Sequence, residues 1–278
     1  MEKKVNLYGH RGWRGKYPEN TMRGFREVMK LDIDGIEIDV HMTKDYHMVV
    51  RHDHNLASTT DKNGFIYNMT LEEVREADAG IKYGEEFKGE KVPTLEEFLE
   101  LMATRPDLRL LLELKDSPEE LGDFAYASAG LALSLCKQYG VYGKDRLSVI
   151  TFSAGNCAWL RARYPREDFN IHGFYPKNLM NGWERDIPYK YYDEVCLFNT
   201  GDKDPVGFPI KHTDPVVDAA RYKEFQLMGI IPCAHYPFNT DEDVYRRSLE
   251  NGAQCFTCDD PDICGEILDK LGARTLHK

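Results

Sequence analysis

The sequence predicts an α/β protein, a (β/α)8 TIM barrel with a small insertion after the third strand. Strand-like and helical stretches alternate from end to end, which is typical of parallel strands with helices outside. Several strand candidates are continuous apolar runs, as in strands that are covered on both sides. The chain has 278 residues and no linker-like stretch, so we expect one domain over residues 1–278. An open doubly wound sheet is the alternative, but no G-x-G-x-x-G motif follows the first strand.

Short apolar runs give nine strand candidates, one more than the barrel needs, so one is extra or belongs to an excursion. The connector from Val40 to Met48 is too short for a helix. We expect it to run back extended along the outside, because seven residues reach about 23 Å. The candidates are Val5–Gly9, Gly35–Val40, Met48–His52, Leu108–Leu114, Leu147–Phe152, Asn170–Phe174, Glu194–Phe198, Gly229–Tyr236 and Gln254–Cys258.

Capping signals mark the helices between these strands. Thr70 and Thr94 each stand three residues before a glutamate, the pattern of a capping box. Residues 55–93 contain one of these helices and many turn residues, and we expect them to form a small lobe over one barrel end. The other predicted helices are Asn20–Leu31, Pro118–Tyr139 and three that begin at Asp214-Pro215, Thr240-Asp241 and Asp260-Pro261.

Composition argues against two classes of partner, nucleic acids and membranes. The net charge of −11 argues against a nucleic-acid polymer, because a phosphate backbone requires a basic face. No apolar run approaches the roughly 18 residues of a membrane span, and the N-terminus has no apolar signal core, so we expect a cytoplasmic protein without stable membrane association. The seven cysteines are scattered and odd in number, and the Cys255–Cys258 pair lacks further zinc ligands, which favours buried free thiols. The oligomeric state is left open.

Two carboxylates in one strand candidate are the first chemical signal. Glu37 and Asp39 are two residues apart, so they lie on the same face of a strand. Like charges in a half-buried place repel each other and are costly to desolvate. A divalent cation removes that cost, and oxygen-only ligands favour Mg²⁺ or Ca²⁺ over zinc. The alternative is a helix-end contact for one carboxylate and an ion pair for the other.

Other polar residues follow three more strand candidates at their ends, where the catalytic end of a barrel lies. Three carboxylates suit a hard cation, and an arginine and a lysine suit a phosphate. Two histidines can share general acid and base duty, and no serine or cysteine nucleophile stands beside them. The set therefore predicts phosphoryl transfer from a small-molecule ester, assisted by a cation. Its members are His10, Arg11, Glu37, Asp39, His52, Glu113 and Lys115.

The first 115 or so residues resemble the glycerophosphodiester phosphodiesterase family closely and in register. The resemblance implies a TIM barrel and a Mg²⁺- or Ca²⁺-dependent hydrolase that releases an alcohol and sn-glycerol 3-phosphate. It implies metal ligands at Glu37, Asp39 and Glu113, an acid/base pair at His10 and His52, and phosphate binding at Arg11 and Lys115. The matching motifs are His10-Arg11-Gly12, Tyr17-Pro18-Glu19-Asn20-Thr21, Glu37-x-Asp39-Val40, Thr43-Lys44-Asp45, Val49-Val50-Arg51-His52-Asp53, Val92-Pro93-Thr94-Leu95-Glu96-Glu97 and Glu113-Leu114-Lys115.

The later part of the chain departs from the family pattern, so the head group of the substrate is left open. Tyr236-Pro237-Phe238-Asn239 replaces the usual Trp-Thr-Val-Asn, and Tyr236 and Phe238 offer either an aromatic wall or a packing contact. Residues Asn199–Thr213 are a candidate loop over the site. His235 is a candidate rim residue and His212 a loop histidine.

Three alternatives in substrate and one in function accompany this prediction. The alternatives within enzymes are phosphodiesterases that act on a lysophospholipid, a glycerophosphoinositol or a sugar phosphodiester. A lysophospholipid requires an apolar rim or an amphipathic face, and the sequence shows no convincing one. The alternative in function is a non-catalytic barrel that binds phosphate esters, for which two histidines are not needed.

Overall fold

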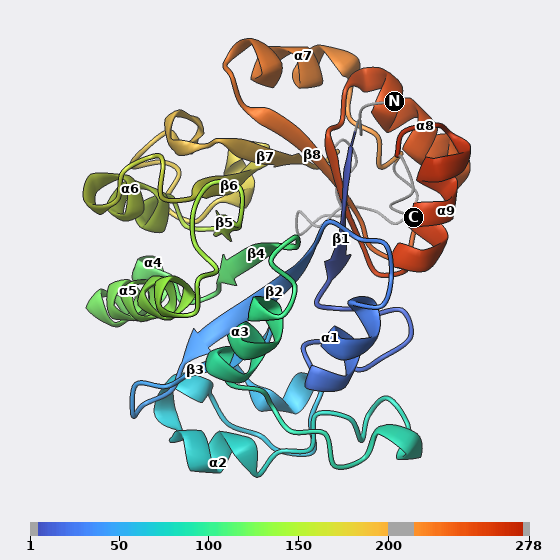
Figure 1. Cartoon of the computed structure of the whole chain (residues 1–278). Coiled ribbons are helices and arrows are strands. Elements are labelled where there is room, and N and C mark those ends of the chain that lie inside the picture. The colour runs from blue at the N-terminus through green and yellow to red at the C-terminus, as the bar shows by residue number, and fades with distance from the viewer. Residues whose placement is uncertain (1–4, 200–213, 275–278) are drawn as a thin grey trace.

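Eight parallel strands close into a barrel in the computed structural model, which describes residues 5–199 and 214–274. β1 pairs with β2 on one side and with β9 on the other, which closes the sheet. Helices lie outside the strands, so the predicted TIM barrel is confirmed (Figure 1). The barrel strands are β1 (Asn6–His10), β2 (Gly35–Met42), β4 (Arg109–Leu114), β5 (Leu147–Ile150), β6 (Asn170–Tyr175), β7 (Glu194–Leu197), β8 (Ile231–Tyr236) and β9 (Cys255–Cys258).

The extra strand is β3 (Met48–Val50), and its expected path was wrong. The chain does not return along the outside of the barrel. Instead, β2 runs past the barrel end to Met42, turns, and pairs with β3 in an antiparallel hairpin in which Val40 faces Val50. This hairpin returns the chain to the rim, where the Arg51 amide donates to the Asp39 carbonyl at 2.8 Å. The insertion therefore follows the returning hairpin strand, between the second and third barrel strands.

The helices follow the predicted pattern with two corrections. Pro118–Tyr139 is not continuous, because Gly122 adopts φ 57° and separates α4 from α5. Asp214-Pro215 does not begin a helix; Asp218 caps the next one instead, by accepting from the Ala220 amide. The helices are α1 (Met22–Val28), α2 (Leu71–Arg75), α3 (Leu95–Ala103), α4 (Pro118–Leu121), α5 (Asp123–Gln138), α6 (Ala154–Arg163), α7 (Ala219–Leu227), α8 (Glu242–Asn251) and α9 (Pro261–Lys270).

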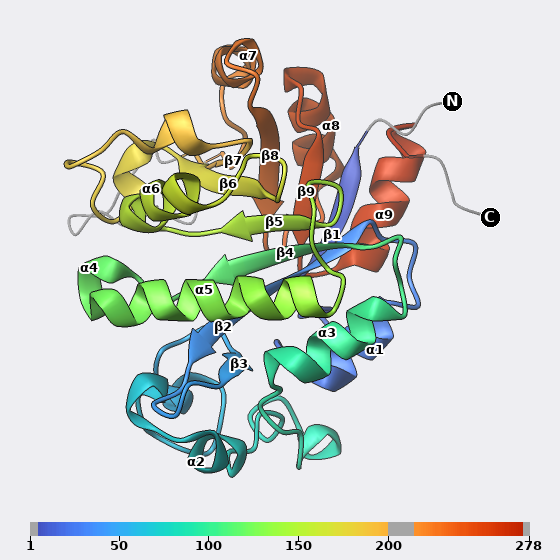
Figure 2. The same cartoon turned by 60° about the vertical axis from the view of Figure 1, so that its left-hand side comes forward.

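The segment between β3 and α3 has its own small core. Both predicted capping boxes are present, at Thr70 and at Thr94. Besides α2, the segment has three short 3₁₀ turns, η1 (Leu56–Ser58), η2 (Ile66–Asn68) and η3 (Glu85–Phe87). It lies beside the β2–β3 hairpin (Figure 2). The division into one domain with an insertion over 55–93 stays a prediction. This separate core is consistent with it. The core residues are Val49, Leu56, Ile66, Val74, Ala77, Ala79 and Val92.

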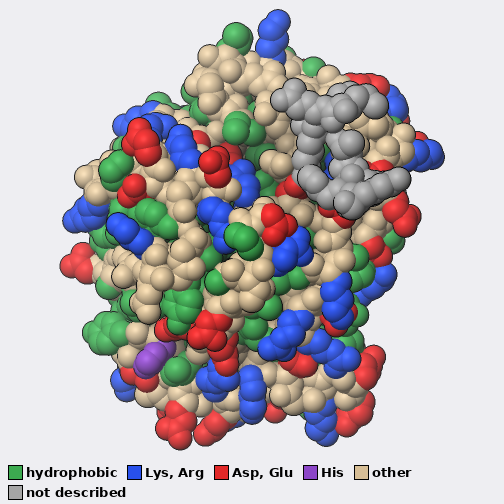
Figure 3. Space-filling model, viewed as in Figure 1, with side chains coloured by type: hydrophobic (Ala, Val, Ile, Leu, Met, Phe, Trp, Pro, Cys, Tyr) green, Lys and Arg blue, Asp and Glu red, His purple; other side chains and the backbone are tan. Residues whose placement is uncertain are grey.

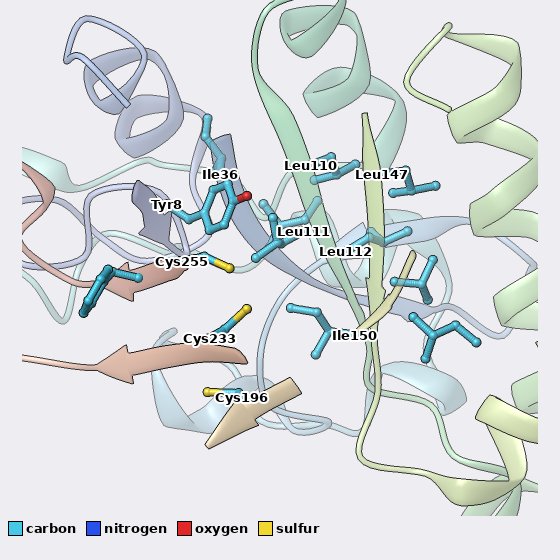
Figure 4. Close-up of a cluster of buried hydrophobic side chains, with 14 of the residues drawn as sticks. Tyr8, Ile36, Leu110, Leu111, Leu112, Leu147, Ile150, Cys196, Cys233 and Cys255 are labelled. Atoms are coloured by element: carbon cyan, nitrogen blue, oxygen red, sulfur yellow. The ribbon is translucent and has the colours of Figure 1, made fainter. Parts of the chain in front are cut away.

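Aliphatic side chains and thiols fill the barrel below the site. Tyr8, Leu111 and Ile150 lie near the thiols of Cys196, Cys233 and Cys255 (Figure 4). All seven cysteines are buried and unpaired, which confirms the predicted free thiols.

One side of the molecule can be judged for a basic binding face. On the side seen in Figure 3, acidic and basic side chains are interspersed. Among the described residues, none of the helices has the length and apolar character required to span a membrane.

Candidate active site

The turn after β1 places two predicted residues against the second strand. A side chain at Gly9 would lie 2.5 Å from the Gly12 carbonyl oxygen, so this close turn requires glycine. Arg11 itself adopts φ 52°, a conformation that costs free energy in a non-glycine residue and is concentrated at functional sites. In this conformation the Arg11 amide donates to Glu37 Oε2 at 3.0 Å. The backbone strain is thus coupled to the orientation of a predicted metal ligand.

Three carboxylates meet at the rim. Register places Asp39 opposite Glu113 and His10 opposite Glu37. The carboxylate oxygens of Glu37, Asp39 and Glu113 lie within 4.8 Å of one another, and all three residues are buried. Asp39 Oδ1 is buried without a hydrogen-bond partner, as expected of an oxygen that awaits a cation. An all-oxygen set of this kind fits Mg²⁺ or Ca²⁺.

The pKa values of Glu37 and Asp39 are shifted in opposite directions. Burial, together with the charges of Asp39 and Glu113, raises the pKa of Glu37 well above its usual value. Burial also acts on Asp39, but the cations Lys115 and Arg11 outweigh it and lower the pKa of that carboxyl far below its usual range. Without a cation, the group therefore carries less than its full negative charge. A divalent ion would favour the ionised form of Glu37.

Two basic side chains border the carboxylates. Lys115 Nζ donates to Glu113 Oε1 at 2.7 Å and lies 3.6 Å from Asp39 Oδ1. Arg11 donates to Glu19 Oε1 at 3.0 Å, and its Nε lies 3.4 Å from Asp39 Oδ2. Burial alone would lower the pKa of both bases, but the neighbouring carboxylates raise it, so both stay charged.

His10 is held on one side by a carboxylate from the end of β9. Its Nδ1 lies 2.6 Å from Asp259 Oδ1, and its Nε2 lies 3.9 Å from Glu37 Oε2. Its ring meets the ring of His235 edge-on, with the centroids 4.5 Å apart. Burial and the charge of Arg11 lower the pKa of His10 well below its usual value. His10 is therefore neutral at pH 7, and its Nε2 faces the predicted cation site.

His52 reaches the same cavity from the hairpin. Its Nδ1 lies 2.6 Å from Asp53 Oδ1, and this contact lowers the pKa of the Asp53 carboxyl far below its usual value. The His52 side chain is 30% exposed, whereas that of His10 is 8% exposed. The two predicted acid/base residues thus differ: one is enclosed and the other is open to solvent.

A cavity of about 130 Å³ lies among these groups. One wall contains five of the predicted residues, and the opposite wall is mostly aromatic. Phe152 and Phe174 stack with their centroids 3.6 Å apart, and Phe198 continues the row. The lining residues are His10, Arg11, Glu37, His52, Glu113, Ile150, Phe152, His172, Phe174, Cys196, Phe198, His235 and Thr257.

A second, wider cavity of about 450 Å³ adjoins the first. The two share His52, Glu113 and Phe152, and Lys115 lines the second one. Its other walls mix polar and apolar side chains and come from the segments after β3, β4, β5 and β6. They include His54, Asn55, Ser117, Glu120, Ser153 and Asn181, together with Phe65 from the insertion.

The predicted residues all converge, but the sequence interpretation missed several of their partners. Asp259 directly follows β9, and its long separation from His10 gave no local signal. Asn20 donates a hydrogen bond to Asp39 Oδ2 at 2.8 Å, and its own backbone adopts φ 54°. It belongs to the Tyr17–Thr21 motif, but the sequence interpretation gave it no role. Position in that motif was the one available signal for Asn20 and Glu19.

The divergent late segments are only partly involved. His235 lines the first cavity as a rim residue. Tyr236 is 3% exposed, exchanges a hydrogen bond with Ser248 and packs on Tyr245, so it has the packing role and not the wall role. Phe238 is exposed and lies under Arg14. His212 and residues 200–213 of the expected loop lie outside the described residues.

Sequence comparisons identify relatives over most of the chain. The profile of the glycerophosphoryl diester phosphodiesterase family matches residues 10–263. The chain is 40% identical to the uncharacterized protein YqiK of Bacillus subtilis. This match extends over 264 residues, which cover 95% of this chain and 98% of that protein. It is 35% identical to a glycerophosphodiester phosphodiesterase of Bacillus altitudinis. This match extends over 189 residues, which cover 68% of this chain and 74% of that protein. A match to the Caldanaerobacter subterraneus enzyme is 46% identical and spans 40% of this chain but only 46% of that enzyme.

Solved structures share the fold. A phosphodiesterase of Oleispira antarctica, in complex with the product sn-glycerol-3-phosphate, has a TM-score of 0.76 at 23% identity, with coverage of 95% of this chain and 96% of that one. The glycerophosphodiester phosphodiesterase of Thermotoga maritima has a TM-score of 0.67 at 18% identity, with coverage of 96% and 100%. At these identities the likeness shows the common barrel.

Proposed function

The chain belongs to the glycerophosphoryl diester phosphodiesterase family, a family of enzymes, and we propose that it hydrolyses glycerophosphodiesters with a divalent cation. The products would be an alcohol and sn-glycerol 3-phosphate. One observation carries the proposal: three carboxylates, two histidines, an arginine and a lysine meet where β1, β2, β3 and β4 end at one rim of the barrel, and five of them line one cavity. Binding of a phosphate ester would not by itself require two histidines, each paired through Nδ1 with a carboxylate.

Glu37, Asp39 and Glu113 would hold the cation, Mg²⁺ or Ca²⁺. The bound ion would neutralise charge on the phosphoryl oxygens as the ester is cleaved. Arg11 and Lys115 would bind the same phosphate from the two sides of the carboxylates. Arg11 is anchored by Glu19 on one nitrogen, which fixes its remaining N–H groups in direction.

His10 and His52 would divide the proton transfers. Neutral His10 donates its Nδ1 hydrogen to Asp259, which leaves an Nε2 lone pair able to accept a proton from the attacking hydroxyl. That hydroxyl is a water or a neighbouring hydroxyl of the substrate. His52, oriented by Asp53 and open to solvent, would protonate the leaving oxygen. The attacking and leaving oxygens of an in-line displacement lie on opposite sides of phosphorus, which suits histidines that approach from different strands.

The two cavities would take the two ester groups of the substrate. The smaller one, with its aromatic wall, suits the three-carbon glycerol group. The wider one is lined by polar residues, Lys115 among them, and by Phe65, Leu114 and Phe152, so it would take an alcohol larger than glycerol. A lysophospholipid has an acyl chain for which neither cavity provides a long apolar channel, and a glycerophosphoinositol or a sugar phosphodiester stays an alternative for the wider cavity. We also propose a cytoplasmic location, since seven unpaired thiols suit a reducing compartment.

A panel of diesters separates these possibilities. Glycerophosphocholine, glycerophosphoethanolamine, glycerophosphoinositol and lysophosphatidylcholine are incubated with Mg²⁺ or Ca²⁺. Released glycerol 3-phosphate is measured for the first three and released choline for the lysophospholipid, whose glycerol keeps its acyl chain. We expect turnover of at least one glycerophosphodiester and its loss with EDTA. If the protein binds these diesters and releases no product under any cation, it is a binding protein and the enzyme proposal is wrong.

A further inference from the structure

A buried histidine and aspartate lie behind His52, outside both cavities. His41 on β2 is 1% exposed, and Asp116, directly after Lys115, is 2% exposed. His41 Nδ1 lies 2.8 Å from Asp116 Oδ1. On the opposite side of the ring, His41 Nε2 lies 3.2 Å from the backbone carbonyl oxygen of His52. Because both ring nitrogens face oxygen acceptors, the ring links Asp116 to the His52 backbone.

Asp116 is itself fixed on its other oxygen. Oδ2 accepts from Ser128 Oγ at 2.6 Å and from the Met42 amide at 2.9 Å. The carboxylate therefore has donors on both oxygens, and its Oδ1 is available only in the direction of His41. Two elements that carry predicted metal ligands, β2 and β4, thus hold this pair between them.

The pair together with His54 also resembles a metal site. Donor atoms of His41, His54 and Asp116 lie within 4.8 Å of one another, and the two imidazole rings are 4.5 Å apart. A cation there would have to replace the contacts of His41 with Asp116 and with the His52 carbonyl oxygen. The hydrogen bonds already satisfy both ring nitrogens, so a hydrogen-bonded link accounts for the cluster without an ion.

We propose that His41, held by Asp116, is a positioning residue that fixes the backbone of His52 relative to the cation-binding strands. His52 follows a strand of only three residues, and its side chain is partly exposed, so its position depends on local anchors. His41 lies two residues after Asp39, and Asp116 lies three residues after Glu113. The link therefore ties the open acid/base residue to the carboxylates, as supporting residues do in preorganised sites. Its catalytic consequence rests on the proposed function.

The first test removes the ring. In His41→Ala we expect kcat to fall about 10- to 100-fold, the usual effect of a lost outer-shell partner, with KM and Ca²⁺ affinity near those of the original protein. Hydrogen exchange of the amides of residues 52–55 should become faster. Ser128→Ala is the matched control: it removes a buried hydrogen bond to the same carboxylate, on the oxygen that His41 does not use. It should lower the melting temperature and lower kcat far less than His41→Ala does, because the Met42 amide still donates to Asp116 Oδ2 and His41 keeps both of its contacts.

A double variant tests the link itself. In His41→Gln alone, a Gln nitrogen that donates to the His52 carbonyl leaves the Gln oxygen against the Asp116 carboxylate, which has no hydrogen to donate, so kcat should fall. In His41→Gln with Asp116→Asn, the Asn nitrogen can donate to the Gln oxygen, and the Gln nitrogen can donate to the His52 carbonyl. We expect this pair to recover kcat to within a few-fold of the original protein. A merely structural role for His41 predicts no such recovery.

Three outcomes would overturn the proposal. In the first, His41→Ala is folded and keeps both its kcat and its slow exchange at residues 52–55. In the second, Ser128→Ala loses as much kcat as His41→Ala. In the third, titration with Zn²⁺ or Ca²⁺ shows a second bound ion that is lost in His41→Ala, which would assign the cluster as a metal site. If the original protein cleaves no diester, the proposed function fails, and the exchange measurement alone then decides whether His41 anchors His52.

Discussion

The two halves of the barrel mouth are built from different residues. The half formed by β1, β2, β4 and the returning β3 carries charged and titratable side chains, among them Glu37, Asp39 and Lys115. The half formed by β5, β6 and β7 presents Phe152, Phe174 and Phe198. The difference indicates a division of labour: the first half performs the proposed chemistry, and the second half shapes the space for one group of the substrate.

The largest effect should follow from removing a carboxylate of the charged half. Glu37→Gln and Glu113→Gln should each lower kcat/KM by about 1,000-fold or more, because a bound cation contributes several kcal/mol to the stabilisation of transition-state charge. Steady-state hydrolysis of a glycerophosphodiester at saturating Ca²⁺ or Mg²⁺ measures this. Glu250→Gln is the control, since Glu250 is exposed on α8, where it pairs with Arg246, and lines neither cavity, so the variant should keep its activity. Equal losses in the three variants would remove the distinction on which the comparison depends.

The histidines of the charged half come next. His10→Ala and His52→Ala should each lower kcat by about 100- to 1,000-fold, the range expected for general acid–base catalysis. Cation affinity should change little, because neither histidine is a proposed ligand. Full turnover in either variant would exclude that residue from the proton transfers.

The aromatic half should affect binding more than chemistry. Phe198→Leu should raise KM about tenfold or less and leave kcat near that of the original protein, since loss of apolar contact weakens substrate and transition state alike. Tyr236→Phe is the control: this ring packs away from the cavity, and only its hydrogen bond to Ser248 is lost. A large loss of kcat in Phe198→Leu would show that the aromatic half also takes part in catalysis.

The smallest effect concerns pH and stability. Burial lowers the pKa values of His10 and His235 below their usual value, so below about pH 6.5 the unfolded chain binds more protons at these positions than the folded one. Stability should therefore fall as the pH falls from 7 to 5. Melting temperatures at fixed ionic strength measure the slope, and His235→Gln should reduce it. A melting temperature that rises steadily toward pH 5 in the original protein, with the same slope in His235→Gln, would contradict buried neutral histidines.

Local sequence patterns were enough to predict the barrel strands and the charged half of the site. Glu37 and Asp39 lie two residues apart in one strand, and each capping box spans four residues. These features could be predicted because they do not depend on distant contacts. The direction of β3 was predicted wrongly because an extended return and a hairpin use the same short connector. Only the pairing of Val40 with Val50 distinguishes them.

Partners that are distant in sequence could not be predicted. His10 and Asp259 are 249 residues apart and meet only because β1 pairs with β9. The aromatic half was missed for a related reason. Phe152, Phe174 and Phe198 each resemble an ordinary core residue at a strand end, and only closure of the barrel turns them toward one cavity. The Pro118–Tyr139 helix was predicted as continuous because Gly122 is compatible with a helix, whereas its φ of 57° is not.

The central claim is that the carboxylates of one half of the mouth hold a cation without which no ester is cleaved. It is tested most directly by measuring Ca²⁺ binding calorimetrically and the hydrolysis rate over the same range of free Ca²⁺, with the metal-free protein as the start. We predict that the two curves have the same midpoint and that both disappear in Glu37→Gln. A rate that is independent of the ion, or that follows it in Glu37→Gln as in the original protein, would contradict the account.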